Sequence, residues 1–426
     1  MISQFGENLS ITRDELRELV SKVLQEAGEL KRVLVLPPDH TRLNSMAGPI
    51  TAMIYEKLTA AGAQVDILPT LGTHNPMTEA QLRMMFGETV PLDAFKAHNW
   101  RNDIVRKGEV PGDMLSELSG GKVDYSVGVE VNKMLLDDYD LIFSVGQVVP
   151  HEVVGMANYT KNICVGAGGS DIINKSHFLG AVCNMETILG RGDTPVRRLF
   201  NHAVETFLSD LPVTYIHTVV EQDYDSGEMH LRGFYAGQEA AVYTDACELA
   251  QKVNITLLDR EPKKVVVYLD PHEFQSTWLG NKSVYRTRMA IADEGELIVL
   301  APSLKEFGED PTIDKLIRKF GYNGTPATLK AVEENEDLRD NLGAAAHLIH
   351  GSSEGRFSIT YCPGEGGVTL DEVRSVGFEA APYAEMAARY NPDELRDGFN
   401  TLPDGEEIFY ISNPALGLWA YKEKFV

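Results

Sequence analysis

Short apolar runs alternate with segments of helical periodicity along most of the chain. Residues 32–36 form a continuous apolar run, which is typical of a buried strand. Residues 45–61 are predicted to be a helix, because apolar side chains recur in them at helical spacing: Ile50, Met53, Ile54 and Leu58. Thr78 with Gln81 forms a capping box that begins another helix. Further strands are expected at residues 64–69, 140–145 and 213–219.

A second region of the same kind follows a short polar linker. Residues 257–264 contain Pro262 and little apolar character, so we place a domain boundary there, between 1–258 and 259–426. The alternation then restarts, with strands expected at 264–269, 296–301, 357–361 and 407–411, and helices at 284–292 and 328–350. The sequence therefore predicts two α/β domains, each with a largely parallel sheet flanked by helices.

Composition narrows the class of protein. The chain has 426 residues, 43% apolar and 24% charged, which is typical of a soluble globular protein of more than one domain. Its formal net charge of −24 disfavours nucleic acid and anionic membranes as partners. The four cysteines form no CxxC pair. No apolar run approaches the length of a membrane span, and the N-terminus lacks the pattern of a signal peptide. These features predict a cytoplasmic protein and leave its oligomeric state open.

Polar clusters follow three of the predicted strands in the first domain. They are residues 38–42, 70–76 and 150–177. Ligands of open α/β sheets bind at the carboxyl ends of the strands. If these strands are parallel neighbours, the three loops line one crevice.

The first two clusters contain candidate binding and acid–base groups. Arg42 can bind a phosphate or carboxylate with Asp39 orienting it, or the two can form a surface ion pair in a turn. His74 lies between Gly72 and Pro76 and could cap the next helix. Paired with His151 it could instead supply the acid and base of a reaction near neutral pH.

The third cluster adds a lysine, glycines and a further histidine. Lys161 enters an apolar run, so it is either a surface residue with a buried stem or a buried reactive amine. The glycines of residues 165–171 could bring backbone amides against an anion, or form a flexible turn. His177 follows a short helix expected at residues 170–176. Since protein zinc sites use three or four protein ligands, a metal on His177 would need ligands that the sequence does not supply.

The spacing of His151, Lys161 and His177, together with Asp39-His-Thr-Arg42 and Thr70-Leu-Gly-Thr-His74, resembles the lactate racemase family that uses a nickel-pincer nucleotide. In organisation the resemblance covers nearly the whole chain. It implies a pyridinium mononucleotide whose two thioacyl arms hold nickel through sulfur, carbon and sulfur.

The resemblance also implies a role for each matched residue. One arm of the nucleotide would be joined to Lys161 as a thioamide, His177 would complete the nickel coordination, and His74 and His151 would exchange protons with the substrate hydroxyl. Cofactor-synthesis proteins would supply the nucleotide, so the isolated chain can lack it. We assign further residues to cofactor binding, namely Asp39, Thr41, Arg42, Gly168, Gly169 and Ser170.

The implied reaction inverts C2 of a 2-hydroxy acid. The Cα proton next to a carboxylate is weakly acidic, whereas removal of a hydride gives a flat keto acid that can be reduced on either face. A histidine on each side would serve the two epimers. We expect this site in the cleft between the domains.

Two departures from the lactate enzymes bear on the substrate. The glycine-rich run before the lysine is replaced by Met156-Ala-Asn-Tyr-Thr160. The Gln and Lys pair that binds lactate is replaced by residues 277–288, whose donors and aromatic faces suit a polyhydroxylated acid. This segment resembles family members linked to sugar acids, and we infer 2-epimerisation of an aldonate such as D-mannonate or D-gluconate. The predicted substrate residues are Trp278, Asn281, Lys282, Tyr285 and Arg286, although Trp278 and Tyr285 could equally be packing residues.

Other classes of function remain open at this point. The chain could be lactate racemase proper, or a non-catalytic protein that binds a sugar acid or another anion. It could also be an isomerase or hydrolase that holds a divalent metal with His40, His74 and His151.

Overall fold

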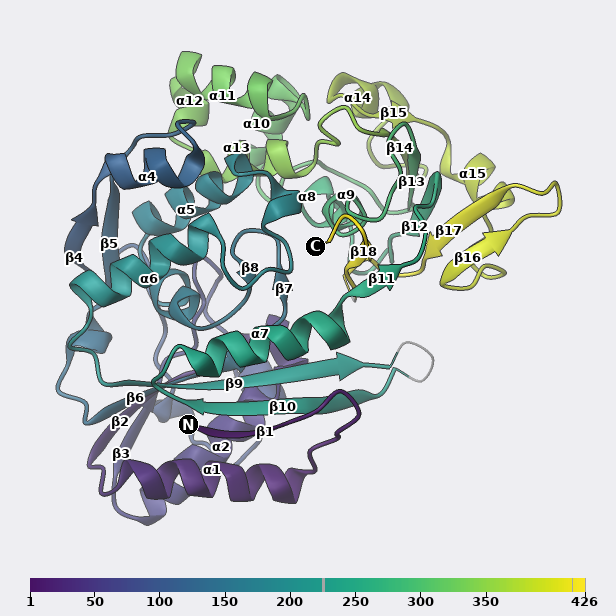
Figure 1. Cartoon of the computed structure of the whole chain (residues 1–426). Helices are drawn as coiled ribbons and strands as arrows, with labels where there is room; N and C mark the ends of the chain where they lie inside the picture. The colour runs from purple at the N-terminus through teal and green to yellow at the C-terminus, as the bar shows by residue number, and fades with distance from the viewer. Residues whose placement is uncertain (224–226, 416, 426) are drawn as a thin grey trace. The chain divides into compact units, whose positions relative to one another are not determined.

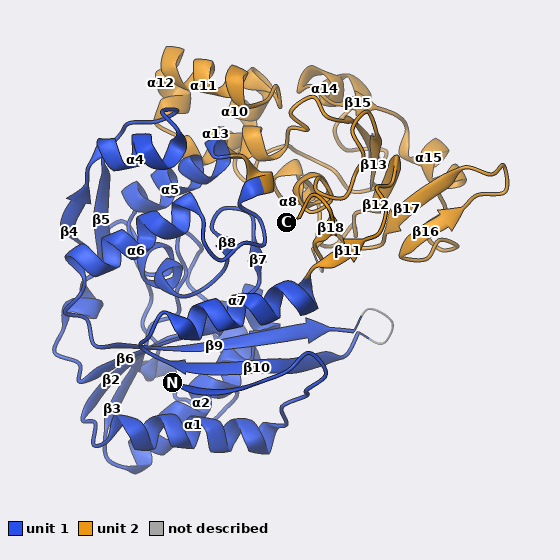
Figure 2. Cartoon of the chain, in the orientation of Figure 1, with its two compact units in different colours: residues 1–183, 187–254 blue, residues 184–186, 255–426 orange. Residues whose placement is uncertain are grey.

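The structure is a computed structural model that describes residues 1–223, 227–415 and 417–425. The chain forms two compact units, which Figure 2 shows in two colours. Unit 1 comprises residues 1–183 and 187–254, and unit 2 comprises residues 184–186 and 255–426. The sequence prediction placed the division at residue 258. No helix among the described residues has both the length and the apolar character to cross a membrane.

Unit 1 is built on a six-stranded sheet with the strand order β1-β10-β9-β6-β2-β3. The neighbours β9, β6, β2 and β3 are parallel, whereas β10 and β1 add an antiparallel edge. The strand bounds are β1 (Ile2–Phe5), β2 (Arg32–Leu36), β3 (Gln64–Ile67), β6 (Leu141–Gln147), β9 (Val213–Gln222) and β10 (Met229–Gly237). Two short pairs lie outside this sheet: β4 (Ile104–Val110) with β5 (Val127–Asn132), and β7 (Pro150–His151) with β8 (Gly155–Met156).

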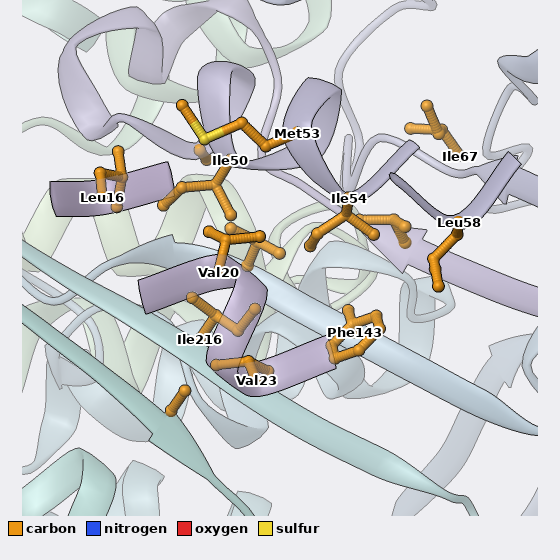
Figure 3. Packing of buried hydrophobic residues seen from close by; sticks show 14 of the residues in the cluster. Leu16, Val20, Val23, Ile50, Met53, Ile54, Leu58, Ile67, Phe143 and Ile216 are labelled. Atoms are coloured by element: carbon orange, nitrogen blue, oxygen red, sulfur yellow. The ribbon is translucent and has the colours of Figure 1, made fainter. Parts of the chain in front are cut away.

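Helices pack on both faces of this sheet. Figure 3 shows Val20 of α1 and Ile50 of α2 packed toward Phe143 and Ile216 of the central strands. Helix α7 packs against β9 and β10 (Figure 1). The helices of unit 1 are α1 (Arg13–Ala27), α2 (Ala47–Ala60), α3 (Glu79–Phe86), α4 (Gly112–Ser119), α5 (Ser170–Val182), α6 (Pro195–Phe207) and α7 (Ala241–Asn254). The predicted capping box of Thr78 and Gln81 is confirmed at the start of α3.

Unit 2 has a second six-stranded sheet, with the order β15-β14-β13-β12-β17-β16. All neighbours in it are parallel except β16 and β17. The bounds are β12 (Lys264–Tyr268), β13 (Glu296–Ala301), β14 (Ser358–Pro363), β15 (Glu379–Ala380), β16 (Gly398–Thr401) and β17 (Glu407–Ile411), with a separate parallel pair of β11 (Thr256–Leu258) and β18 (Trp419–Tyr421). The predicted α/β class with sheets rich in parallel strands is thus confirmed.

Two helices predicted in unit 2 are wrong in extent. The helix expected at 284–292 ends at Tyr285, because the chain turns and Met289 forms a bridge with Ala420 of β18. The helix expected at 328–350 is broken twice, at an extended Asn335 and at Asn341, which caps the next helix. The observed helices are α8 (Thr277–Gly280), α9 (Lys282–Tyr285), α10 (Pro311–Phe320), α11 (Thr325–Glu334), α12 (Glu336–Arg339), α13 (Leu342–His350), α14 (Leu370–Ser375) and α15 (Tyr383–Arg389).

Candidate active site

The loops that follow β2, β3 and β6 meet at one buried side chain, Asn162. Its amide nitrogen donates to the carbonyl oxygen of Leu36 at 3.1 Å and to the hydroxyl of Ser144 at 3.0 Å. Its amide oxygen accepts from the Thr70 hydroxyl at 2.8 Å. Because Leu36 ends β2, Thr70 follows β3 and Ser144 lies within β6, Asn162 links the segment after β6 to three neighbouring parallel strands through one side chain.

Asp39 supports His74 from within the first loop. The buried Asp39 carboxylate accepts from Thr41 through its backbone amide at 3.1 Å and its hydroxyl at 2.5 Å, and lies 2.5 Å from Nδ1 of His74. Burial raises the pKa of Asp39, but the hydrogen bonds from His74 and Thr41 outweigh it and lower the pKa below its ordinary value. A carboxylate only accepts, so Nδ1 of His74 carries a proton, and in the neutral ring Nε2 then presents a lone pair. The exposed imidazole of His74 is therefore held as a base.

His151 is held in the opposite tautomer. It ends the short strand β7 and is buried, and its Nδ1 accepts from the backbone amide of Val153 at 3.2 Å. In the neutral ring the proton then resides on Nε2. Burial lowers the pKa of His151 well below its ordinary value, and the charges of Lys161 and Arg42 lower it further against the opposing effect of Glu152. His151 thus presents an N–H donor.

Lys161 lies immediately before a π-helical turn, Asn162–Gly166. Burial lowers the pKa of its amine to about 8, with Arg42 as the next largest cause. A π-helical turn in an otherwise regular fold is frequently found at functional sites. The lysine therefore has an unusually large neutral fraction for an alkylamine, which favours nucleophilic chemistry at this position.

His177 presents a lone pair from the middle of α5. Its Nδ1 donates to the carbonyl oxygen of Ile173 at 2.6 Å, which leaves Nε2 unprotonated in the neutral ring. Burial lowers the pKa of His177, and the charges of Lys161 and Glu152 also act on it. A neutral imidazole whose other N–H bonds a backbone carbonyl is the arrangement found in metal-binding histidines.

These groups are close enough to influence one another, since the pKa of His151 responds to Arg42, Glu152, Lys161 and His177. Over the described ranges no three His, Cys, Asp or Glu side chains are grouped to hold a metal ion. His177 could therefore hold a metal only with donors brought by another molecule. The set combines one base, one N–H donor, one partly neutral amine and one free imidazole lone pair.

Residues 8–188 match the family model for the lactate racemase N-terminal domain. That part of the chain is therefore similar to the N-terminal domain of the lactate racemase family. The matched range contains the four residues whose geometry is given above: His74, His151, Lys161 and His177.

Two solved structures share the fold over almost the whole chain. One is a structural-genomics crystal structure of a protein from Thermotoga maritima, with a TM-score of 0.81 and 23% identity, covering 98% of this chain and 100% of that one. The other is the lactate racemase apoprotein from Thermoanaerobacterium thermosaccharolyticum, with a TM-score of 0.71 and 17% identity, covering 96% and 93%. No curated protein matches the chain in sequence.

The glycine cluster differs from its predicted use. The amides of Gly168 and Gly169 donate to the carbonyls of Val165 and Glu130, both at 3.2 Å. A Cβ on Gly168 would lie 1.8 Å from the Cys164 carbonyl oxygen, and one on Gly169 would lie 2.3 Å from the Glu130 carboxylate. These glycines permit close packing, and their amides are used within the fold instead of facing an anion. Ser170 begins α5, whose Asp171 amide donates to the Glu130 carboxylate at 3.4 Å.

Asp39 and Thr41 have a structural role besides the predicted cofactor binding, which stays a prediction. Both belong to the hydrogen-bond network that supports His74. Arg42 remains exposed, and its charge acts on Lys161 and His151. Asn162 was missed by the sequence analysis. The available signal was a polar residue at the start of an apolar run, directly after Lys161.

The predicted substrate residues of unit 2 fall into two groups. Asn281 is fully buried: its oxygen accepts from the Tyr361 hydroxyl at 2.7 Å and its nitrogen lies 3.4 Å from His347. Its amide is thus engaged within the unit, which disagrees with a substrate role. Tyr285 and Arg286 are also buried. By contrast, the side chains of Trp278 and Lys282 are partly exposed.

Proposed function

We propose that the chain is a 2-hydroxy acid racemase or epimerase that uses a nickel-pincer nucleotide attached to Lys161. The observation that carries the proposal is that His74, His151, Lys161 and His177 all come from the segments that follow the parallel strands β3 and β6, that hydrogen bonds fix the tautomer of each neutral imidazole, and that the pKa of Lys161 is lowered to about 8. The family match over residues 8–188 supports the reaction class.

The residues of this chain fit the proposed cofactor. Nε2 of His177 offers one neutral nitrogen, and the absence of a three-residue metal cluster among the described residues agrees with a metal whose other donors come from a nucleotide. The amine of Lys161, with a pKa of about 8, is suited to acylation by a thiocarboxylate arm. When bound, this cofactor supplies the acceptor for the C2 hydride.

The two histidines would act on the substrate oxygen. Nε2 of His74 would take the hydroxyl proton, and the Asp39 carboxylate would stabilise the imidazolium that results. The Nε2–H of His151 would donate to the oxygen as it gains carbonyl character, in the manner of a neutral imidazole that polarises a carbonyl. Arg42 would bind the substrate carboxylate or a cofactor phosphate.

We further propose that the substrate is a sugar acid, with the aldonates D-mannonate and D-gluconate as the first candidates. Trp278 supports this choice because its ring is partly exposed and held against His347, with ring centroids 4.4 Å apart. An aromatic face of this kind suits the C–H face of a polyol chain. Lys282 lies 3.7 Å from Glu273 and offers a cation for a carboxylate.

The experiment is to produce the chain together with cofactor-synthesis proteins and analyse it in two ways. Mass spectrometry should show the nucleotide on the peptide that contains Lys161, and Lys161→Arg should abolish it. The loaded protein should then invert C2 of a hydroxy acid in a panel of aldonates and lactate, followed with a C2 deuterium label. An unmodified Lys161 in a preparation that inverts C2 would overturn the cofactor assignment. Binding of aldonates without exchange of the label would favour a non-catalytic sugar-acid protein, and inversion of lactate alone would correct the substrate.

A further inference from the structure

Arg197 is a buried guanidinium in α6 that bonds only neutral groups. It is 2% exposed, and the described residues place no carboxylate in an ion pair with it. Its two terminal nitrogens donate to the Thr160 hydroxyl at 2.7 Å and to the carbonyls of Met156 and Asn158 at 2.8 and 3.1 Å. Burying a cation without a counter-charge is costly, so its partners point to a specific task.

All three partners lie in the five residues that lead into Lys161. Within this segment Asn158 and Tyr159 have φ values of 65° and 58°. Two consecutive non-glycine residues in the left-handed region are unfavourable and persist only where the surroundings hold them. The segment therefore has a conformation that glycines would adopt at no steric cost, but it is built here from Asn and Tyr.

The surroundings hold this segment from several elements of unit 1. The Asn158 amide nitrogen lies 2.9 Å from Nδ1 of the buried His217 on β9. The Tyr159 ring stacks on Tyr243 of α7 with centroids 4.9 Å apart, and the guanidinium carbon of Arg197 lies 4.4 Å from the centroid of the Tyr243 ring. Arg197 is the one of these groups that spans the segment, since its partners are residues 156, 158 and 160.

We propose that Arg197 is a positioning residue, which holds residues 156–160 with Asn158 and Tyr159 in the left-handed conformation and thereby fixes where the Lys161 side chain enters the site. The relevance to catalysis rests on the proposed function, because Lys161 is there the attachment point. The charge of Arg197 also contributes to the lowered pKa of Lys161.

The test uses Arg197→Lys in the cofactor-free protein, with Arg198→Lys as its matched control. Lysine keeps the charge but cannot reach three acceptors, whereas the exposed Arg198 pairs with Asp193 on the surface. Hydrogen exchange of the peptide covering residues 155–166 should become about tenfold faster in Arg197→Lys, while peptides from α1 keep their wild-type rates. Arg198→Lys should leave both regions unchanged.

A second readout separates position from charge. The rate at which an amine reagent labels Lys161 at high pH, where that amine is neutral in both proteins, should change about tenfold in Arg197→Lys, so that this rate reports the position of Lys161 and not the charge at residue 197. Thr160→Val, which removes one acceptor, should move both readouts in the same direction by less. Wild-type exchange and labelling in Arg197→Lys would overturn the proposal. If instead both readouts move but Lys161 never carries a nucleotide, the proposed function fails and the positioning role stands.

Discussion

The lowered pKa of Lys161 gives a prediction that needs neither cofactor nor substrate. Burial and Arg42 bring the pKa from 10.5 to about 8. At pH 7 the neutral fraction of an amine with a pKa near 8 is about one in ten, against about one in 3,000 for an ordinary lysine. The structure therefore predicts that Lys161 has about 300 times as much reactive neutral amine at pH 7 as an unperturbed lysine.

Competitive labelling measures this directly. The cofactor-free protein is treated with a trace of an amine reagent between pH 6 and 11, and the modification of each lysine is read by peptide mass spectrometry. Lys161 should show a midpoint near pH 8. Lys133 serves as the internal reference, because its amine donates a hydrogen bond to Asp103 that raises its pKa above the ordinary value, so its midpoint should lie well above that of Lys161.

The cause of the shift can be tested by removing one charge. Arg42→Gln should move the midpoint of Lys161 upward, because the positive charge of Arg42 lowers that pKa. Glu152→Gln should move it downward, because the negative charge of Glu152 raises it. A wild-type midpoint near 10.5 would refute the reasoning, and so would an Arg42→Gln shift in the downward direction.

Three further predictions follow from the same geometry. In the loaded enzyme, Asp39→Asn should lower turnover by about 10²–10⁴-fold with little change in KM, because an amide at residue 39 no longer holds the proton on Nδ1 of His74. Unchanged steady-state kinetics would contradict this prediction. Gly166→Ala should cost about 1–3 kcal/mol in urea denaturation, since its Cβ would lie 2.6 Å from the Thr70 side chain, whereas Gly6→Ala meets only ordinary contacts and should be neutral. In NMR spectra of ¹⁵N-histidine-labelled protein, His151 should show the Nε2–H tautomer at neutral pH, because its pKa lies well below the ordinary value. A midpoint near 6.5 would contradict the structure.

The sequence predicted the central parallel strands, because these are continuous apolar runs, but it missed strands such as β4, β5 and β10, which are not. The runs at 32–36, 296–301 and 407–411 coincide with observed strands. Helices in unit 2 were predicted less well, because the breaks at Asn335 and Asn341 are made by single residues within a chain that keeps helical periodicity. The pairing of Met289 with β18 depends on a partner far away in the sequence. Local patterns carry no information about such partners.

The site residues were predictable as residue types but not as networks. Loop position after parallel strands indicated Asp39, His74 and His151, yet the Asp39 contact with His74 joins two different loops and has no local pattern. The glycine cluster suggested an anion site because glycines expose backbone amides. In the fold those amides are satisfied by Val165 and Glu130, which the sequence could not indicate.

The opposite tautomers of the two histidines make them chemically unequal, although a reaction that interconverts epimers uses both. His74 can accept a proton on Nε2 as it stands, because Asp39 holds the other nitrogen protonated. His151 can accept one on Nε2 only if its proton moves to Nδ1, which would break the hydrogen bond from Val153. The lowered pKa of His151 also disfavours a doubly protonated ring as the route between these tautomers. If the protein acts as proposed, its resting state is prepared for the epimer whose hydroxyl faces His74, and reaction from the other epimer would require a local rearrangement at residues 151–153. The overall equilibrium constant fixes the ratio of the kcat/KM values for the two directions. The chemical inequality of His74 and His151 must therefore appear as a difference in the individual kcat and KM values of the two epimers.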